Sequence, residues 1–138
     1  VVPHAPEVLA ELHRNCRIGV VTCCQKMHFK TIHDASGLRP FFDFVVGDGD
    51  FERHKPYPDP YLTALGRAGI APDEAIAVED SERGVLSAVR AGIRVAAIPR
   101  GISLCGDFSA ATWRLQDIRE LPALLDSLQP RNENSQPQ

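Results

Sequence analysis

The chain alternates short, almost continuously apolar runs with segments whose apolar residues recur at helical spacing. Such runs are typical of strands buried on both faces, because a strand with one wet face alternates apolar and polar residues. Strands separated by helices need crossover connections, which predicts an α/β fold of three Rossmann-like layers, a parallel sheet with helices on both faces. The predicted strands are residues 17–22, 41–46, 75–78 and 93–98, with a weaker one at 111–115.

Capping residues indicate where the predicted helices begin and end. Asp59 is expected to be the N-cap of one helix, and Gly69 stands where a C′ glycine is expected. Ser81 is the expected N-cap of the next helix, and Asp117 with Glu120 resembles a capping box for the last. The predicted helices are residues 6–15, 26–36, 59–69, 81–92 and 117–128.

The 138 residues suit one domain. Residues 1–129 form the predicted α/β core, and residues 130–138 form a predicted disordered tail that has no apolar residue beyond proline. The net charge is −3 and no basic stripe is present, which argues against a nucleic-acid partner. No apolar run approaches the roughly 20 residues of a membrane span.

Cysteine usage indicates the compartment. The four cysteines form no C-x-x-C pair, and their number does not make a disulfide framework in a chain of this length. A zinc site is poorly supported because the histidines do not space with them. The expected location is therefore the reducing cytoplasm.

Polar side chains fall at or just beyond the ends of the predicted strands. They are Thr22, Asp48, Glu79, Asp80 and Arg100. Open α/β sheets bind ligands at the carboxyl ends of their strands, so we expect a ligand site there.

Thr22 and Lys55 are the candidate phosphate ligands. The hydroxyl of Thr22 suits donation to a phosphate oxygen beside a helix N-terminus, or simple capping of the following helix. Lys55 lies in a proline-fenced loop, where its ammonium would neutralise a phosphoryl group or remain solvated. We expect its neighbours Arg53 and His54 to be plain surface residues.

Glu79 and Asp80 end a buried strand, where two carboxylates are costly unless they meet a cation or hydrogen-bond donors. Mg²⁺ suits such a site, because it takes one or two carboxylates together with water and substrate phosphate. Asp80 is the better ligand candidate. Glu79 would bind the ion through water or hold Lys55. The alternative is that the pair caps the next helix.

Two further pairs have an ordinary interpretation. Asp48-Gly-Asp50 follows an apolar run, as an aspartyl nucleophile and its partner acid would, but the sequence is also typical of a turn, which we favour. Cys23-Cys24 would suit a thiolate phosphatase only with an arginine a few residues on, and none follows. A core or strand-end role is expected for both cysteines.

In order and spacing, these segments resemble the haloacid dehalogenase (HAD) superfamily, in the branch of phosphoglycolate phosphatase and β-phosphoglucomutase. The resemblance extends over about residues 3–128. The order Thr22, Lys55, Glu79-Asp80 also argues against a receiver domain, in which the acidic pair comes first. The matching segments are Gly19-Val-Val-Thr22, Lys55-Pro-Tyr-Pro-Asp-Pro-Tyr-Leu62, Val78-Glu-Asp-Ser81 with Gly84, and Ala88-x-x-Ala-Gly92.

The resemblance implies a role for each site residue. Thr22 and Lys55 would bind the transferring phosphoryl group of a small phosphorylated metabolite. Cys23 would join them, at a position where many relatives carry asparagine. Asp80, with Glu79, would hold Mg²⁺.

The resemblance also implies two parts that do not precede Thr22 in this chain: an Asp-x-Asp nucleophile on a central strand, and a helical cap. We therefore expect Mg²⁺-dependent phosphomonoester hydrolysis by the intact protein and inactivity of this chain alone, because covalent phosphoryl transfer depends on the attacking carboxylate. The alternative is a non-catalytic module that binds phosphate, metal or a protein. An N-terminal segment, a partner chain or a homo-oligomer is expected to fill the slot in the sheet.

Overall fold

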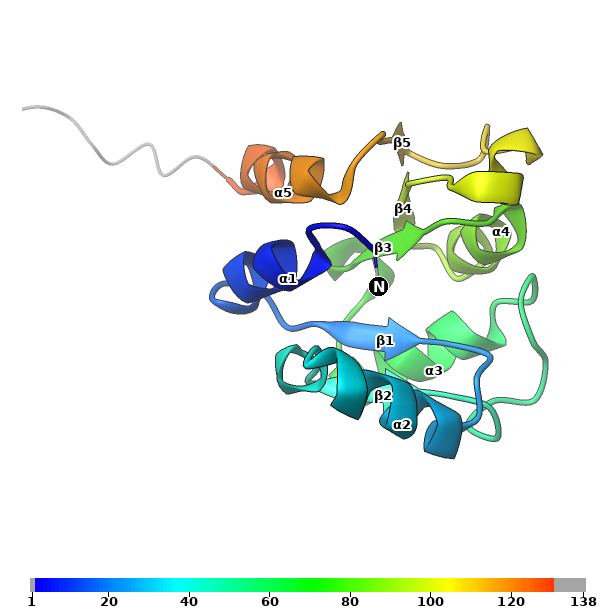
Figure 1. Ribbon diagram of the computed structural model, residues 1–138. Coiled ribbons are helices and arrows are strands. Elements are labelled where there is room, and N and C mark those ends of the chain that lie inside the picture. The colour runs from blue at the N-terminus through cyan, green and yellow to red at the C-terminus, as the bar shows by residue number, and fades with distance from the viewer. Residues whose placement is uncertain (1, 131–138) are drawn as a thin grey trace, which may run out of the picture.

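The computed structural model describes residues 2–130, and its elements follow the predicted alternation (Figure 1). The strands are β1 (Gly19–Val21), β2 (Phe44–Val46), β3 (Ile76–Glu79), β4 (Arg94–Ala97) and β5 (Trp113–Arg114). The helices are α1 (Ala5–His13), α2 (Lys26–Ser36), α3 (Asp59–Ala68), α4 (Glu82–Arg90) and α5 (Leu121–Leu128). Residues 131–138 of the predicted tail lie outside the described residues. Between residues 2 and 130, no helix has the length and apolar character needed to cross a bilayer.

The strands form two parallel groups. β1 pairs with β2, and β3, β4 and β5 pair in that order. The predicted α/β architecture with parallel strands is confirmed. Among the described residues, no ladder joins β1 to β3.

The hydrogen bonds at the strand ends show which backbone groups face outward. Asp43 N donates to Ile18 O and Thr22 N donates to Val46 O, so alternate residues of β1 bond to β2. The amides and carbonyls of Gly19 and Val21 therefore face away from β2. Similarly, Ile98 N donates to Glu79 O, which leaves Ile76 and Val78 facing away from β4. Both β1 and β3 thus present an open edge.

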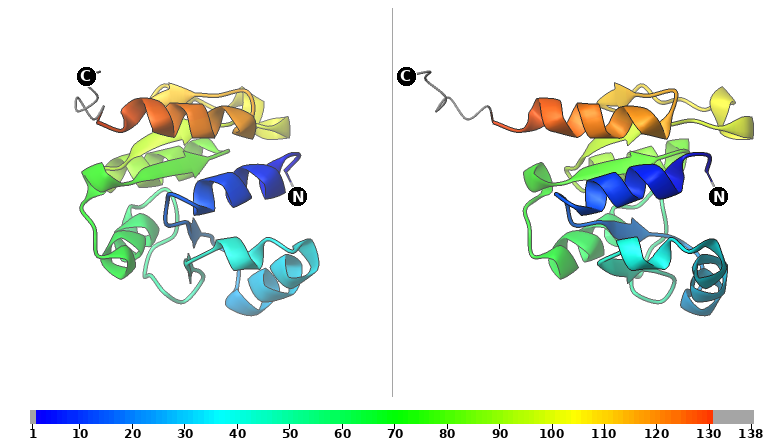
Figure 2. Two further views of the ribbon diagram at one scale, coloured as in Figure 1. Left: turned by 90° about the vertical axis from the view of Figure 1, so that its left-hand side faces the viewer. Right: turned by 60° about the vertical axis from the view of Figure 1, so that its left-hand side comes forward.

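Helices cover both faces of the β3–β4–β5 sheet. Ala77, Val95 and Ala97 pack with α3 and α4 in one apolar cluster. Ala96 and Ile98 point to the opposite face and pack with α1 and α5. Figure 2 turns this second face toward the viewer, with α1 and α5 in front. The period of two along β4 therefore divides one strand between two cores.

Local signals located several boundaries correctly. Ser81 is the N-cap of α4, and its Oγ accepts a hydrogen bond from Gly84 N at 3.1 Å. Gly69 ends α3 with a left-handed φ of 66°, which glycine adopts at little cost. The predicted box of Asp117 and Glu120 is present, but it caps a 3₁₀ turn, Ile118–Glu120, so the predicted start of the last helix at 117 is wrong and α5 begins at Leu121.

Two further local predictions were wrong. The predicted strand 41–46 begins at Phe44, because Arg39–Phe41 forms a 3₁₀ turn around Pro40, which has a fixed φ and no N–H to donate. Asp59 is not an N-cap, because Pro58 occupies that position and the Asp59 carboxylate accepts hydrogen bonds from Arg53.

Candidate functional site

The five residues predicted to bind phosphate or metal line one pocket at the carboxyl ends of the strands. The pocket has a volume of about 370 Å³ and lies between the ends of β1 and β3, with Arg100 beyond β4 also in its wall. Asp48 does not line it. The predicted residues that line it are Thr22, Cys23, Lys55, Glu79 and Asp80.

Lys55 connects the two groups of strands. Its Nζ lies 2.5 Å from Glu79 Oε1 at the end of β3 and donates to Val21 O, on the open edge of β1, at 3.1 Å. The Lys55 side chain is only 15% exposed, so it is not a solvated loop lysine. An ammonium has three donors, and these two bonds leave one N–H for a ligand in the pocket.

Glu79 is held from three sides. Its side chain is 8% exposed, and Oε1 accepts a hydrogen bond from Tyr61 Oη at 2.5 Å as well as from Lys55. Burial, and then the Glu79 charge, raise the pKa of Tyr61 well above its usual value, so the phenol stays protonated and donates. A Cβ on Gly84 would lie 1.9 Å from Glu79 Oε2, so only glycine lets α4 approach this carboxylate.

Asp80 is the carboxylate that remains available at the pocket. It is exposed, and among residues 2–130 its side chain makes no hydrogen bond or ion pair. No group of three or more metal-ligating side chains occurs in that part of the chain. One free carboxylate beside a pocket that also holds a lysine fits a single protein ligand of Mg²⁺, which retains several waters and binds substrate phosphate.

Thr22 shapes the turn after β1. Its Oγ1 accepts a hydrogen bond from Cys24 N at 3.1 Å, while α2 begins at Lys26 with Gln25 as its N-cap. The helix-capping alternative for Thr22 is therefore wrong, and its hydroxyl hydrogen is still available to a ligand. Both cysteines follow the end of β1. Cys23 is exposed and Cys24 is half-buried, so neither belongs to the core.

Asp48 and Asp50 belong to the turn after β2. The Asp50 side chain is 8% exposed and accepts from Gly47 N at 3.0 Å. It also pairs with Lys26 at 2.5 Å and with Arg67 at 3.0 Å. Neither aspartate lines the pocket, which supports the turn interpretation.

Asp50→Asn is expected to lower the free energy of unfolding by about 2 kcal/mol at neutral pH, because it removes charge-assisted hydrogen bonds. The Gly47 amide and then Lys26 hold the pKa of Asp50 well below its usual range. A depressed folded pKa contributes stability above the ordinary carboxyl pKa of about 3.9, and that contribution is lost as the pH falls below it.

Urea unfolding across a pH series measures this difference between wild type and Asp50→Asn. The difference should shrink as the pH falls below about 4. Asp34→Asn is the control, since Asp34 forms an exposed pair with Arg39 and should change stability by no more than about 0.5 kcal/mol. An equal loss in both variants would contradict the structural role given to Asp50.

Comparison with known proteins finds relatives in one family. The family described as haloacid dehalogenase-like hydrolase matches residues 1–98. Protein CbbY from Rhodobacter capsulatus is 33% identical over 105 residues, which are 74% of this chain and 46% of that protein. The phosphoglycolate phosphatase of Escherichia coli (strain K12) is 32% identical over 91 residues, 65% of this chain and 36% of the enzyme. The chain thus spans less than half the length of these curated relatives.

A solved structure extends the similarity to the fold. The crystal structure of CbbY from Rhodobacter sphaeroides in complex with phosphate superposes with a TM-score of 0.81 at 29% identity, over 87% of this chain and 55% of that one. The same relative has been solved with xylulose-(1,5)bisphosphate. The family match covers well over half of the sequence, and the chain therefore belongs to the haloacid dehalogenase-like hydrolases.

Proposed function

We propose that the intact protein is a Mg²⁺-dependent phosphatase of small phosphomonoesters that acts in the cytoplasm. One observation carries the proposal: Thr22, Lys55 and Asp80, from three separate segments, converge on one pocket at the carboxyl ends of parallel strands. The names of the relatives support the substrate class, since one is a phosphoglycolate phosphatase and another binds phosphate.

Each residue has a distinct part in this proposal. The free N–H of Lys55 and the Thr22 hydroxyl would bind phosphoryl oxygens, with Cys23 beside them in the pocket wall. Asp80 would hold Mg²⁺, which when bound neutralises charge on the phosphoryl group. Glu79 would keep Lys55 in place, because its Oε1 already accepts from Lys55 and Tyr61. These groups position and stabilise, and a nucleophile is still required.

We propose that the nucleophile reaches the pocket on a further strand between β1 and β3. The outward-facing backbone groups of Gly19 and Val21 on one side, and of Ile76 and Val78 on the other, support this location. A strand between these edges would end at the pocket. It would also pair the Val21 carbonyl, which accepts from the Lys55 ammonium.

The purified 138-residue chain is expected to bind inorganic phosphate without turning over a phosphomonoester. Phosphate binding is measured by calorimetry with and without Mg²⁺, and turnover with p-nitrophenyl phosphate. Asp80→Asn should remove the effect of Mg²⁺ on phosphate binding, whereas Asp126→Asn, an exposed carboxylate on α5, should leave it unchanged. Mg²⁺-dependent turnover that Asp80→Asn abolishes would overturn the expected inactivity of the chain alone.

A non-catalytic module that binds phosphate or metal is the second candidate. The pocket carboxylates favour this candidate. Glu79 is engaged by Lys55, and Asp80 would be taken up by the metal, so neither carboxylate is free to act as the nucleophile. Expressing the chain together with whatever its gene encodes upstream of Val1 separates the two. Phosphatase activity in that longer protein supports the enzyme, and phosphate binding without turnover supports the module.

A further inference from the structure

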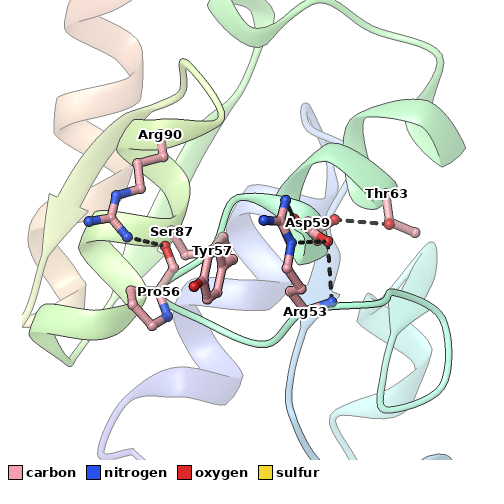
Figure 3. A network of polar contacts seen from close by, with 7 residues as sticks. All are labelled: Arg53, Pro56, Tyr57, Asp59, Thr63, Ser87 and Arg90. Atoms are coloured by element: carbon pink, nitrogen blue, oxygen red, sulfur yellow. Dashed lines mark hydrogen bonds and ion pairs between the residues drawn. The ribbon is translucent and has the colours of Figure 1, made fainter.

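The segment Lys55–Tyr57 that carries the pocket lysine is fixed by α4. Three α4 side chains donate to three consecutive carbonyls of the segment, and Figure 3 shows Ser87 and Arg90 beside it. The bonds are Arg83 Nη2 to Lys55 O at 2.5 Å, Arg90 Nη1 to Pro56 O at 3.0 Å, and Ser87 Oγ to Tyr57 O at 2.6 Å.

The spacing of these donors matches a helix. Positions 83, 87 and 90 are i, i+4 and i+7, so they form one stripe along α4. Ser87 is fully buried, and a buried hydroxyl is costly unless it is hydrogen-bonded. Its bond to the Tyr57 carbonyl is therefore an integral part of the packing between the loop and the helix.

The segment has few means of ordering itself. Pro56 and Pro58 have no N–H, so Tyr57 contributes the one backbone donor of residues 56–58, to His54 O at 3.0 Å. On its other side, Arg53 stacks over the Tyr57 ring at 4.5 Å and pairs with Asp59 (Figure 3). The Lys55 side chain is held by Glu79 and Val21 O, and the donors on α4 anchor the backbone of the segment.

α4 also begins directly after the acidic pair, with Ser81 as its N-cap. One rigid helix is therefore connected at its start to Glu79 and Asp80 and along its side to the backbone of Lys55. We infer that Arg83, Ser87 and Arg90 are positioning residues that set the Lys55 ammonium relative to Asp80. The anchoring of the segment rests on the three hydrogen bonds. The role of that anchoring in phosphate binding rests on the proposed function.

The test combines hydrogen exchange with phosphate affinity in Arg83→Met, Arg90→Met and their double variant. The Tyr57 amide reports on the segment, and the Val95 amide in β4, which donates to Thr112 Oγ1, reports on the rest of the fold. Loss of the anchors should speed Tyr57 exchange by about tenfold or more while Val95 exchange changes little. The double variant should bind inorganic phosphate about tenfold more weakly.

Arg94→Met is the matched control, because Arg94 also donates to a backbone carbonyl, that of Asp73 in the 3₁₀ turn Pro72–Glu74, outside the Lys55–Tyr57 segment. It should alter neither Tyr57 exchange nor phosphate affinity. Ser87→Ala provides a second variant that removes one anchor without removing a charge, and it should also speed Tyr57 exchange.

Each outcome decides a separate question. Unchanged Tyr57 exchange in the double variant would overturn the anchoring. Faster exchange with unchanged phosphate affinity would overturn the positioning role. If the wild-type chain binds no phosphate, the proposed function fails, and the exchange rates still decide whether α4 orders the segment.

Discussion

Gly84→Ala is expected to lower the free energy of unfolding by about 3 kcal/mol. The added Cβ would lie 1.9 Å from Glu79 Oε2 and 2.2 Å from Glu79 Cδ, and a carboxylate held by Lys55 and Tyr61 has little room to move. The substitution therefore either pushes α4 away from β3 or breaks the buried ion pair. Chemical unfolding of purified protein measures the loss.

Gly66→Ala is the matched control. Gly66 is also a glycine within a helix, but a Cβ there meets nothing within 4 Å. Alanine is the better helix former, so Gly66→Ala should raise stability by about 0.5–1 kcal/mol. If the two variants were equally stable, the close contact between Gly84 and Glu79 would not exist in solution.

Lys55→Met is expected to cost about 2–3 kcal/mol of stability and to weaken phosphate binding by about tenfold or more. The methionine leaves the buried Glu79 carboxylate without its cation, which is the costly part of breaking such a pair. Lys30→Met, at an exposed position on α2, should change neither quantity. Calorimetry with inorganic phosphate and urea unfolding provide the two measurements.

A double-mutant cycle separates the two contributions of Lys55. Adding Glu79→Gln to Lys55→Met removes the stranded charge, so the double variant should be at least about 1 kcal/mol more stable than the sum of the single effects predicts. Phosphate binding should stay weak, because the ammonium is still missing. Recovery of phosphate affinity in the double variant would contradict a direct role for Lys55.

The sequence was sufficient for the parts of the fold that depend on local chemistry. Ser81 caps α4 and Gly69 ends α3, since a side-chain acceptor and a residue without a Cβ serve those positions in almost any context. The gathering of Thr22, Lys55 and Asp80 also followed from sequence, because parallel strands bring their carboxyl ends to one edge.

Tertiary contacts decided the rest. Asp59 has the local signature of a cap, but the Arg53 guanidinium, six residues earlier, takes its carboxylate. From the sequence, Glu79 could either bind the metal through water or hold Lys55. In the structure it holds Lys55, and the Tyr61 hydroxyl, which sequence reasoning missed, donates to the same carboxylate oxygen. The presence of Tyr61 in the same short segment as Lys55 was the available signal.

The division of the strands into two groups has a consequence for how the molecule unfolds. A continuous ladder makes neighbouring strands lose their backbone hydrogen bonds together, but no ladder crosses from β1 to β3 in residues 2–130. The two groups are coupled by side chains, through α3, whose Tyr61 and Leu65 share an apolar cluster with Val21, and through the Lys55–Glu79 pair. Cooperativity between the two halves therefore depends on side-chain contacts, and a substitution at Lys55 should weaken it.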